Sequence, residues 1–210
     1  MSPEVAGTIA IAKDVAMGLA AVVGATAAVI GLKAWRHQLR GHTEYELARR
    51  LLRAVYHARD ELHAVRNPLI LTGEFAAARQ EAGIERDDKR TAFSAEEEGA
   101  VYERRWKRLS SAMSDLQLEV TEAEVVWGRA VVGQLKPLRE CVGELYASLM
   151  LFLRRKQERP QGRSANPEAL ERIDRIIYKI SDDPDQDPFT GKVARAVAQV
   201  EDFVRPYLRL

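Results

Sequence analysis

Cysteine, histidine and strand-like patterns are scarce in this sequence, and their scarcity excludes several kinds of structure. The single cysteine, Cys141, excludes an internal disulfide and suits a reducing compartment, where a lone cysteine among apolar neighbours packs as a small hydrophobic residue. Beyond residue 32, the chain also lacks the alternation of apolar and polar residues that marks half-buried strands. We therefore predict an all-α fold without disulfides.

Catalytic motifs are absent as well. Gly191 and Lys192 do not form a phosphate-binding loop, because the glycine required six residues before the lysine and the preceding strand are missing. No serine-hydrolase elbow is present, and nothing close to Cys141 in the sequence would lower the pKa of its thiol. We predict no enzymatic activity and no cofactor.

Potential metal ligands gather on one predicted helix, which carries His57, Asp60, Glu61 and His63. Di-metal sites in helical bundles also require glutamates and a Glu-x-x-His motif from other helices. The chain has no histidine after His63, and two carboxylates on another predicted helix, Glu119 and Glu122, do not complete such a site. We interpret the cluster as a solvated polar face and predict no metal.

An acidic, proline-containing turn lies near the C-terminus. Asp183, Asp185 and Asp187 alternate as the first ligands of a calcium-binding EF-hand loop do. The glycine expected at the sixth loop position is absent, and Ala194 replaces the closing glutamate. We interpret the segment as a helix-capping turn without calcium.

Neither sign of charge is in excess, since 32 basic and 31 acidic residues give a net charge of +1. The chain therefore lacks the basic excess typical of nucleic-acid-binding proteins, and we expect no nucleic-acid partner. Five basic residues nevertheless cluster in one turn-rich segment: Arg154, Arg155, Lys156, Arg159 and Arg163. We interpret this basic loop as hydrated, while contact with lipid, nucleic acid or the acidic turn at 182–187 stays open.

One long apolar run is present, because residues 15–32 carry no charged side chain. A helix of this length covers about 27 Å, close to the hydrocarbon thickness of a bilayer. The basic residues expected to contact anionic lipid headgroups follow it directly: Lys33, Arg36 and Arg40. Lys13 is the only basic residue before it, so the positive-inside rule puts the N-terminus outside and the C-terminal body in the cytoplasm. The sequence thus predicts a single-pass protein of the cytoplasmic membrane, with the lipid bilayer as a partner.

Two other interpretations of residues 15–32 remain open. A cleaved secretory signal would use Lys13 as its basic region and the small residues at 25–27 as its cleavage site. A buried helix of a soluble core is the second alternative. If residues 15–32 span a membrane, four small residues at successive i+4 positions lie on one face of the helix: Ala16, Ala20, Gly24 and Ala28. Such residues let two helices approach closely, so homo-oligomers can form.

The rest of the chain is patterned as helices. Gly41 interrupts the pattern, and Thr43 with Glu46 has the spacing of a capping box, so a new helix is expected to begin there. Asn67 and Pro68 should end that helix. A short helix is expected within the following segment, before a charged loop.

The longest predicted helix begins at a second capping-box pair, Ser94 and Glu97. Its apolar residues recur at alternating steps of four and three and form a coiled-coil-like packing seam: Tyr102, Trp106, Leu109, Met113, Leu116, Val120, Ala123, Trp127 and Ala130. Gly133 and Pro137 are expected to mark a turn or a sharp kink after it. Further apolar stripes follow, and Pro206 should end the last helix.

Each of these helices has one apolar stripe, so none is stable alone and they must pack as an antiparallel bundle. We therefore predict a tail, anchor and juxtamembrane segment at 1–40 and a cytoplasmic all-helical domain at 41–210. The expected function is a scaffold, regulatory subunit or assembly factor that works through protein–protein contacts. Two alternatives remain. An oligomerising, membrane-perturbing effector would need a pore, yet Thr26 is the only polar residue between the ends of the span. A helical-bundle metalloenzyme would have to bind metal when purified.

Overall fold

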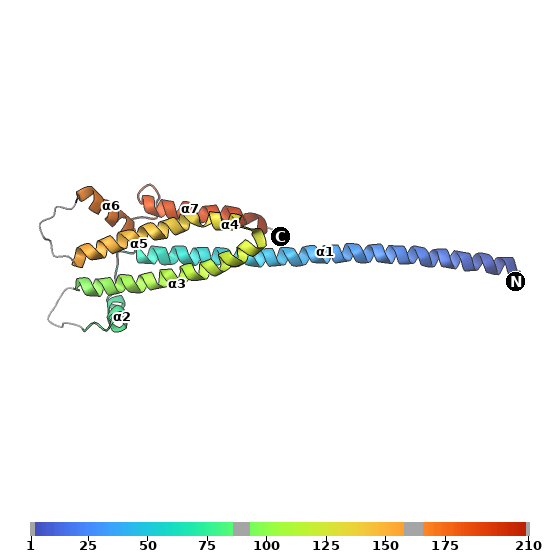
Figure 1. The fold of residues 1–210 in the computed structure, drawn as a ribbon, viewed down its shortest axis with the longest axis horizontal. Helices are drawn as coiled ribbons and strands as arrows, with labels where there is room; N and C mark the ends of the chain where they lie inside the picture. Colours follow the sequence, from blue (N-terminus) through green and yellow to red (C-terminus); the bar gives the residue numbers. More distant parts are fainter. Residues whose placement is uncertain (1–2, 86–92, 158–165, 209–210) are drawn as a thin grey trace. The chain divides into compact units, whose positions relative to one another are not determined.

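The computed structural model describes the backbone at 3–85, 93–157 and 166–208. Within 3–40, the described side chains are those of Met17, Gly24, Ala25, Thr26, Ala28, Gly31, Leu32 and Trp35. The helices drawn in Figure 1 are α1 (Pro3–Val65), α2 (Thr72–Ala82), α3 (Ala95–Trp127), α4 (Ala130–Gln134), α5 (Lys136–Gln157), α6 (Pro167–Ile177), α7 (Pro188–Val204) and the 3-10 helix η1 (Arg205–Leu208). All regular structure in these described ranges is helical, which confirms the predicted all-α class.

Helix α1 is longer than predicted. It runs through Gly41 without interruption, so the capping-box pair Thr43 and Glu46 does not start a new helix, and this prediction is wrong. A glycine inside a helix costs only about 1 kcal/mol and keeps its N–H group, so a single glycine among helix-forming residues does not end the helix. The predicted end before Asn67 and Pro68 is confirmed.

The chain divides into two compact units, one of residues 1–46 with Leu210 and the other of Leu47–Arg209. In the first unit, residues 15–32 are helical, but most of their side chains lie outside the described residues. Among the residues that are described, no helix is both long enough and apolar enough to cross a membrane.

The sites predicted on this first unit are described only in part. Gly24 and Ala28 of the small-residue face are exposed. The side chains that lie outside the described residues are those of Ala16, Ala20, Lys33, Arg36 and Arg40. Self-association and lipid contact by this segment therefore stay predictions.

In the second unit, residues 47–65 of α1 form a four-helix bundle with α3, α5 and α7 (Figure 1). A residue early in one helix meets a residue late in its neighbour, so neighbouring helices are antiparallel. Helices α1 and α3 are joined by Arg50–Glu119 and Glu61–Arg108, and α3 and α5 by Gln117–Arg139 and Glu98–Lys156. Helix α7 contacts α4 through Gln134–Gln199 and α5 through Glu144–Lys192. Its contacts with the C-terminal end of α1 are Tyr56–Glu201 and Arg66–Thr190. The predicted helical bundle is confirmed.

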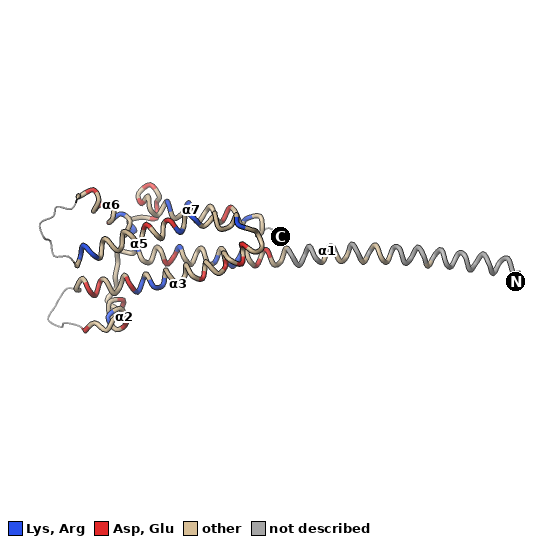
Figure 2. The backbone as a smooth tube through the Cα atoms, in the orientation of Figure 1, with Lys and Arg blue, Asp and Glu red and all other residues tan. Residues whose placement is uncertain are grey.

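The core of the bundle is built from one apolar stripe of each helix. Fully buried side chains from all four helices include Leu51, Leu62, Leu109, Leu116, Leu145, Val193 and Val200. Burying a side chain of this size stabilises the fold by about 1.5–3 kcal/mol. Basic and acidic residues are interleaved along the same helices (Figure 2), so each helix is amphipathic and depends on its neighbours for stability.

The predicted packing seam lies on and next to the inward face of α3. The buried members are Tyr102, Leu109, Leu116, Val120 and Ala123. Trp106, Met113 and Trp127 are partly buried, whereas Ala130 belongs to α4 and is exposed. Ala112 and Arg105 are buried as well, so the inward face is wider than a strict coiled-coil seam.

The capping box at the start of α3 is confirmed. The hydroxyl of Ser94 accepts a hydrogen bond from the N–H of Glu97 at 3.1 Å, and Glu97 Oε2 accepts one from the N–H of Ser94 at 2.7 Å. Each side chain satisfies a backbone donor that the first helical turn leaves free. The structure also confirms the short helix after Pro68 as α2 and the end of the last α-helix before Pro206.

Helix α3 ends earlier than predicted. Helix α3 ends at Trp127, and Gly128 has a φ of 76°, in the left-handed region that favours glycine. Gly133 lies inside α4, and Pro137 lies in the first turn of α5, where a missing N–H costs no helical hydrogen bond. A turn at Leu135, between these two residues, separates α4 from α5, so the predicted turn or kink is confirmed.

Candidate functional site

A cleft of about 520 Å³ opens on the bundle between α3 and α5, and the end of α2 borders it. We call it the α3–α5 cleft. Its apolar lining consists of Ala82, Ile84, Ala100, Tyr102, Trp106, Tyr146, Leu149, Met150 and Leu153, and its remaining lining of Glu96, Gly99, Glu103 and Gln157. A concave, mostly apolar surface with a few polar groups is the usual form of a binding site.

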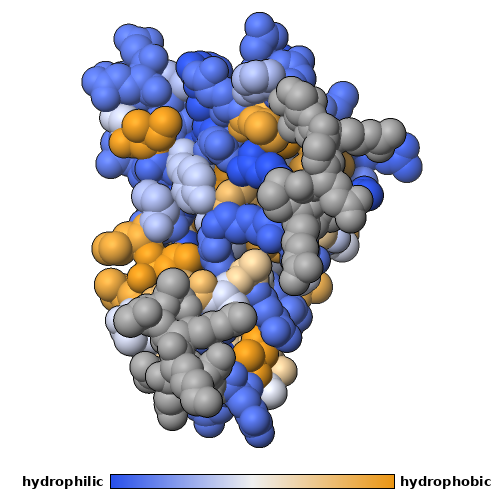
Figure 3. All heavy atoms as spheres, turned by 90° about the vertical axis from the view of Figure 1, so that its left-hand side faces the viewer, coloured by the Kyte–Doolittle hydropathy of each residue, from blue (hydrophilic) through white to orange (hydrophobic). Residues whose placement is uncertain are grey.

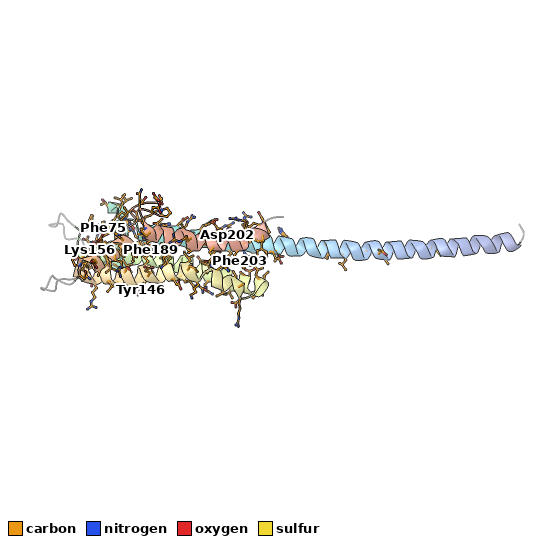
Figure 4. All side chains as sticks on the ribbon, turned by 90° about the horizontal axis from the view of Figure 1, so that it is seen from above. Phe75, Tyr146, Lys156, Phe189, Asp202 and Phe203 are labelled. Atoms are coloured by element: carbon orange, nitrogen blue, oxygen red, sulfur yellow. The ribbon has the colours of Figure 1, made fainter. Side chains whose placement is uncertain are left out.

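Helix α5 lines the cleft because it has a second apolar face beside its core stripe. Leu145 and Leu149 are fully buried, whereas Tyr146 and Met150, one residue further along, are 45% and 42% exposed. In Figure 4, the labelled Tyr146 lies at the edge of the bundle. Figure 3 looks onto the end of the bundle that carries α6 and shows hydrophobic side chains at the surface in patches among hydrophilic ones.

Aromatic rings line the cleft, and two of them lie at one of its ends. The rings of Trp106 from α3 and Tyr146 from α5 lie 4.8 Å apart, centroid to centroid, with 38° between their planes. Tyr102 lies one turn earlier on α3 and packs edge-on against the buried Phe152, with centroids 5.6 Å apart. Contacts of this kind favour defined positions of the large aromatic side chains.

The charged side chains that line the cleft are both carboxylates of α3, Glu96 and Glu103. Glu103 lies 2.9 Å from the ammonium group of Lys107 in an exposed i, i+4 pair. Gly99 lies on the same helix, and a Cβ atom added there would have no neighbouring atom within 4 Å. Acidic side chains therefore lie at the border of the cleft, and there is space beside Gly99 for a larger side chain.

Helix α2 is held beside the cleft by a buried arginine of α3. Arg105 is only 3% exposed and donates hydrogen bonds to both carboxylate oxygens of Glu74, at 2.6 and 2.7 Å. It also donates to the carbonyl oxygens of Asn67 and Leu69. The hydrogen bonds from Arg105 lower the pKa of Glu74 despite its partial burial. This arginine therefore fixes both α2 and the segment that leads to it.

A second buried arginine joins the end of α1 to the segments around α6 and α7. Arg66 is fully buried and donates to the carbonyl of Ile176 at 2.7 Å, the hydroxyl of Thr190 at 2.8 Å and Oδ2 of Asp187 at 2.9 Å. Its guanidinium also lies over the ring of Phe189, 4.6 Å from the centroid. Arg66 and Asp187 are buried and paired with each other, and we interpret this network as structural.

Burial alone raises the pKa of Asp187, but the hydrogen bond from the N–H of Thr190 and the charge of Arg66 outweigh this effect and lower the pKa. The same hydrogen bond, at 2.9 Å, makes Asp187 the N-cap of α7. The predicted helix-capping role of the acidic turn is confirmed at this residue.

Two of the potential metal ligands predicted from the sequence are engaged in ion pairs. Glu61 pairs with Arg108 and Asp60 with Arg59. Burial, followed by the charge of Lys179, lowers the pKa of His63 to about 4. In the described part of the chain, no three His, Cys, Asp or Glu side chains gather closely enough to hold a metal ion.

The first three residues of the predicted basic loop lie in the last turn of α5 instead, so the prediction of a loop is wrong there: Arg154, Arg155 and Lys156. Lys156 pairs with Glu98 of α3, and Arg155 lies 3.0 Å from Asp174 of α6. Arg159 and Arg163 lie outside the described residues.

Cys141 is buried in the core, and burial raises the pKa of its thiol, which makes it a weak nucleophile.

The α3–α5 cleft was missed by reasoning from the sequence. Tyr146, Met150 and Leu153 follow each other at helical steps of four and three, and this pattern was a usable signal of a second apolar face. The two buried arginines gave no comparable signal, because their partners are distant in sequence.

Comparison with protein-family models, with curated proteins and with solved structures finds no match to this chain.

Proposed function

We propose that this chain is a single-pass, membrane-anchored protein whose helical bundle works in the cytoplasm through protein–protein contacts, as a scaffold, regulatory subunit or assembly factor. The observation that carries the proposal is the α3–α5 cleft. Tyr146 and Met150 leave nearly half of their surface in water, although helix α5 already buries a complete core stripe. Exposed aromatic and methionine side chains around a concavity are enriched at protein interfaces.

The membrane part of the proposal rests on the sequence. Residues 15–32 have the length and lack of charge of a single span, and more basic residues follow them closely than precede them. Lys33, Arg36 and Arg40 would then contact anionic headgroups, each charge adding about 1 kcal/mol of attraction. The small residues of the span, Gly24 among them, would support homo-oligomers within the bilayer.

The test is the composition of the complex that the full chain forms after extraction from membranes in a mild, uncharged detergent. We expect a complex on a native gel that contains a second protein in fixed stoichiometry. A chain recovered only as a monomer or as its own oligomer would contradict the proposed function.

A further inference from the structure

The α3–α5 cleft has the geometry and charge to recognise one kind of partner. We infer that it binds a helical segment of another protein whose apolar stripe is flanked by lysine or arginine. This inference rests on the proposed function and specifies the chemistry of the partner.

The shape of the cleft favours a helix. Helices α3 and α5 are antiparallel neighbours, and the groove between two packed helices accepts the apolar side chains of a third. Along α5 the cleft extends from Tyr146 to Gln157 and along α3 from Glu96 to Trp106. Each stretch is about three helical turns, roughly 15 Å, which is long enough for anchor residues at i, i+3 or i+4, and i+7 of a bound helix.

Helix α2 is a short helix that already packs against α3. Phe75 and Ala78 of α2 pack against Val101 of α3. Beside this apolar contact, Arg79 of α2 donates a hydrogen bond of 2.8 Å to Glu97 of α3. The outer side of α3 thus combines apolar contacts with pairing of a helical arginine to its carboxylates.

The charge of the cleft selects a basic partner. Among the described residues, the charged side chains that line the cleft are Glu96 and Glu103, and none of the described lining residues is basic. An acidic segment would be repelled, whereas a lysine or arginine beside the apolar stripe of the partner would pair with these carboxylates. The present contact of Glu103 with Lys107 does not prevent this, because both side chains are about two-thirds exposed and such surface pairs are weak.

Two glycines provide a matched pair of variants. A Cβ at Gly99 would meet no atom within 4 Å, so Gly99→Leu extends into the cleft without disturbing the core. Gly143 of α5 is equally free of neighbours within 4 Å, is exposed and does not line the cleft. Both changes replace a helical glycine by a strong helix former, so both variants should fold at least as well as the parent.

The experiment is photo-crosslinking from the cleft of the full chain in its own membranes. Benzoylphenylalanine replaces Met150, which is 42% exposed, and mass spectrometry identifies the residue that it labels. We expect the labelled residue to lie in an amphipathic helical segment with adjacent lysine or arginine. Gly99→Leu should reduce the yield about tenfold, as the loss of a central contact does, whereas Gly143→Leu should leave it unchanged. Glu103→Lys should reduce it more than Glu103→Gln.

Labelling of an acidic segment, of lipid or of this chain itself would overturn the inference, as would a yield that Gly99→Leu does not change. A second crosslinker at Leu118 separates this failure from failure of the proposed function, because Leu118 is 70% exposed on α3 and does not line the cleft. If Leu118 labels a protein partner and Met150 labels none, the inference about the cleft fails and the proposed function stands. If neither position labels another protein, both fail.

Discussion

Arg66 and Asp187 lie 121 residues apart in the sequence and form a buried ion pair, with Nη2 2.9 Å from Oδ2 and side chains that are 0% and 1% exposed. The pair fixes the end of α1 to the first turn of α7 and so closes the bundle between its first and last helices.

Removing one partner of this pair leaves the other without its counter-charge in the interior. We expect Arg66→Met or Asp187→Ala to lower the free energy of unfolding by about 3–5 kcal/mol. Urea unfolding of the full chain in detergent measures this loss. The control is Lys107→Ala, which removes an exposed ion pair with Glu103 and should cost less than about 1 kcal/mol. Equal, small losses for the buried and the exposed pair would show that the buried pair does not stabilise the bundle.

Arg105 should control the stability of α2 in particular. It supplies both hydrogen bonds to Glu74 and those to two carbonyl groups before α2. Arg105→Met leaves these acceptors unpaired, and we expect a loss of about 3 kcal/mol with faster hydrogen exchange of residues 72–82. Arg104→Met, which removes the more exposed pair with Glu81, is the matched control. If α2 exchanges equally fast in both variants, Arg105 does not hold it.

His63 should make the bundle less stable as the pH falls from about 6.5 to about 4. Its pKa is about 4 in the folded protein, against about 6.5 in an unfolded chain. Between these values the unfolded state binds a proton and the folded state does not, so protonation favours unfolding. The contribution of His63 to stability is therefore fully present above about pH 6.5 and is lost as the pH falls to about 4. Below about pH 4 it does not change further.

Unfolding in urea at several pH values tests this dependence, and His63→Asn should flatten it between pH 6.5 and 4. An NMR titration of the His63 ring that gives a pKa near 6.5 would contradict the assignment. Asp187 and Glu74 have lowered pKa values and contribute stability that is lost only at more acidic pH.

The small-residue face of the predicted span provides a prediction about oligomers. Gly24→Ile should reduce crosslinked oligomers in detergent several-fold, because a branched side chain keeps two helices apart. Ala25→Ile is the control, since Ala25 is the next residue and lies off the face at 16, 20, 24 and 28. Unchanged crosslinking of the Gly24→Ile variant would show that this face does not mediate self-association.

The parts of the fold that depend on neighbours in the sequence were predictable. The capping box at Ser94 and Glu97 and the helix ends before Pro68 and Pro206 follow from local hydrogen bonding and from the missing N–H of proline. Glycine is a weaker signal, because its effect depends on packing. Gly41 lies inside a helix, whereas Gly128 ends one.

The candidate site was harder to predict, because it depends on contacts between distant segments. The assumption of one apolar stripe per helix hid the second face of α5, on which Tyr146 and Met150 lie. Arg66 and Arg105 resemble surface arginines in the sequence, and only the folded chain brings their acceptors to them.

The central claim is that residues 15–32 anchor the chain with the bundle on the cytoplasmic side. The most direct measurement is alkaline carbonate extraction of membranes, followed by protease treatment of intact spheroplasts. We predict that the chain stays in the pellet and that the bundle is protected until the spheroplasts are lysed. Release of the chain into the carbonate supernatant, or digestion of the bundle in intact spheroplasts, would contradict the account.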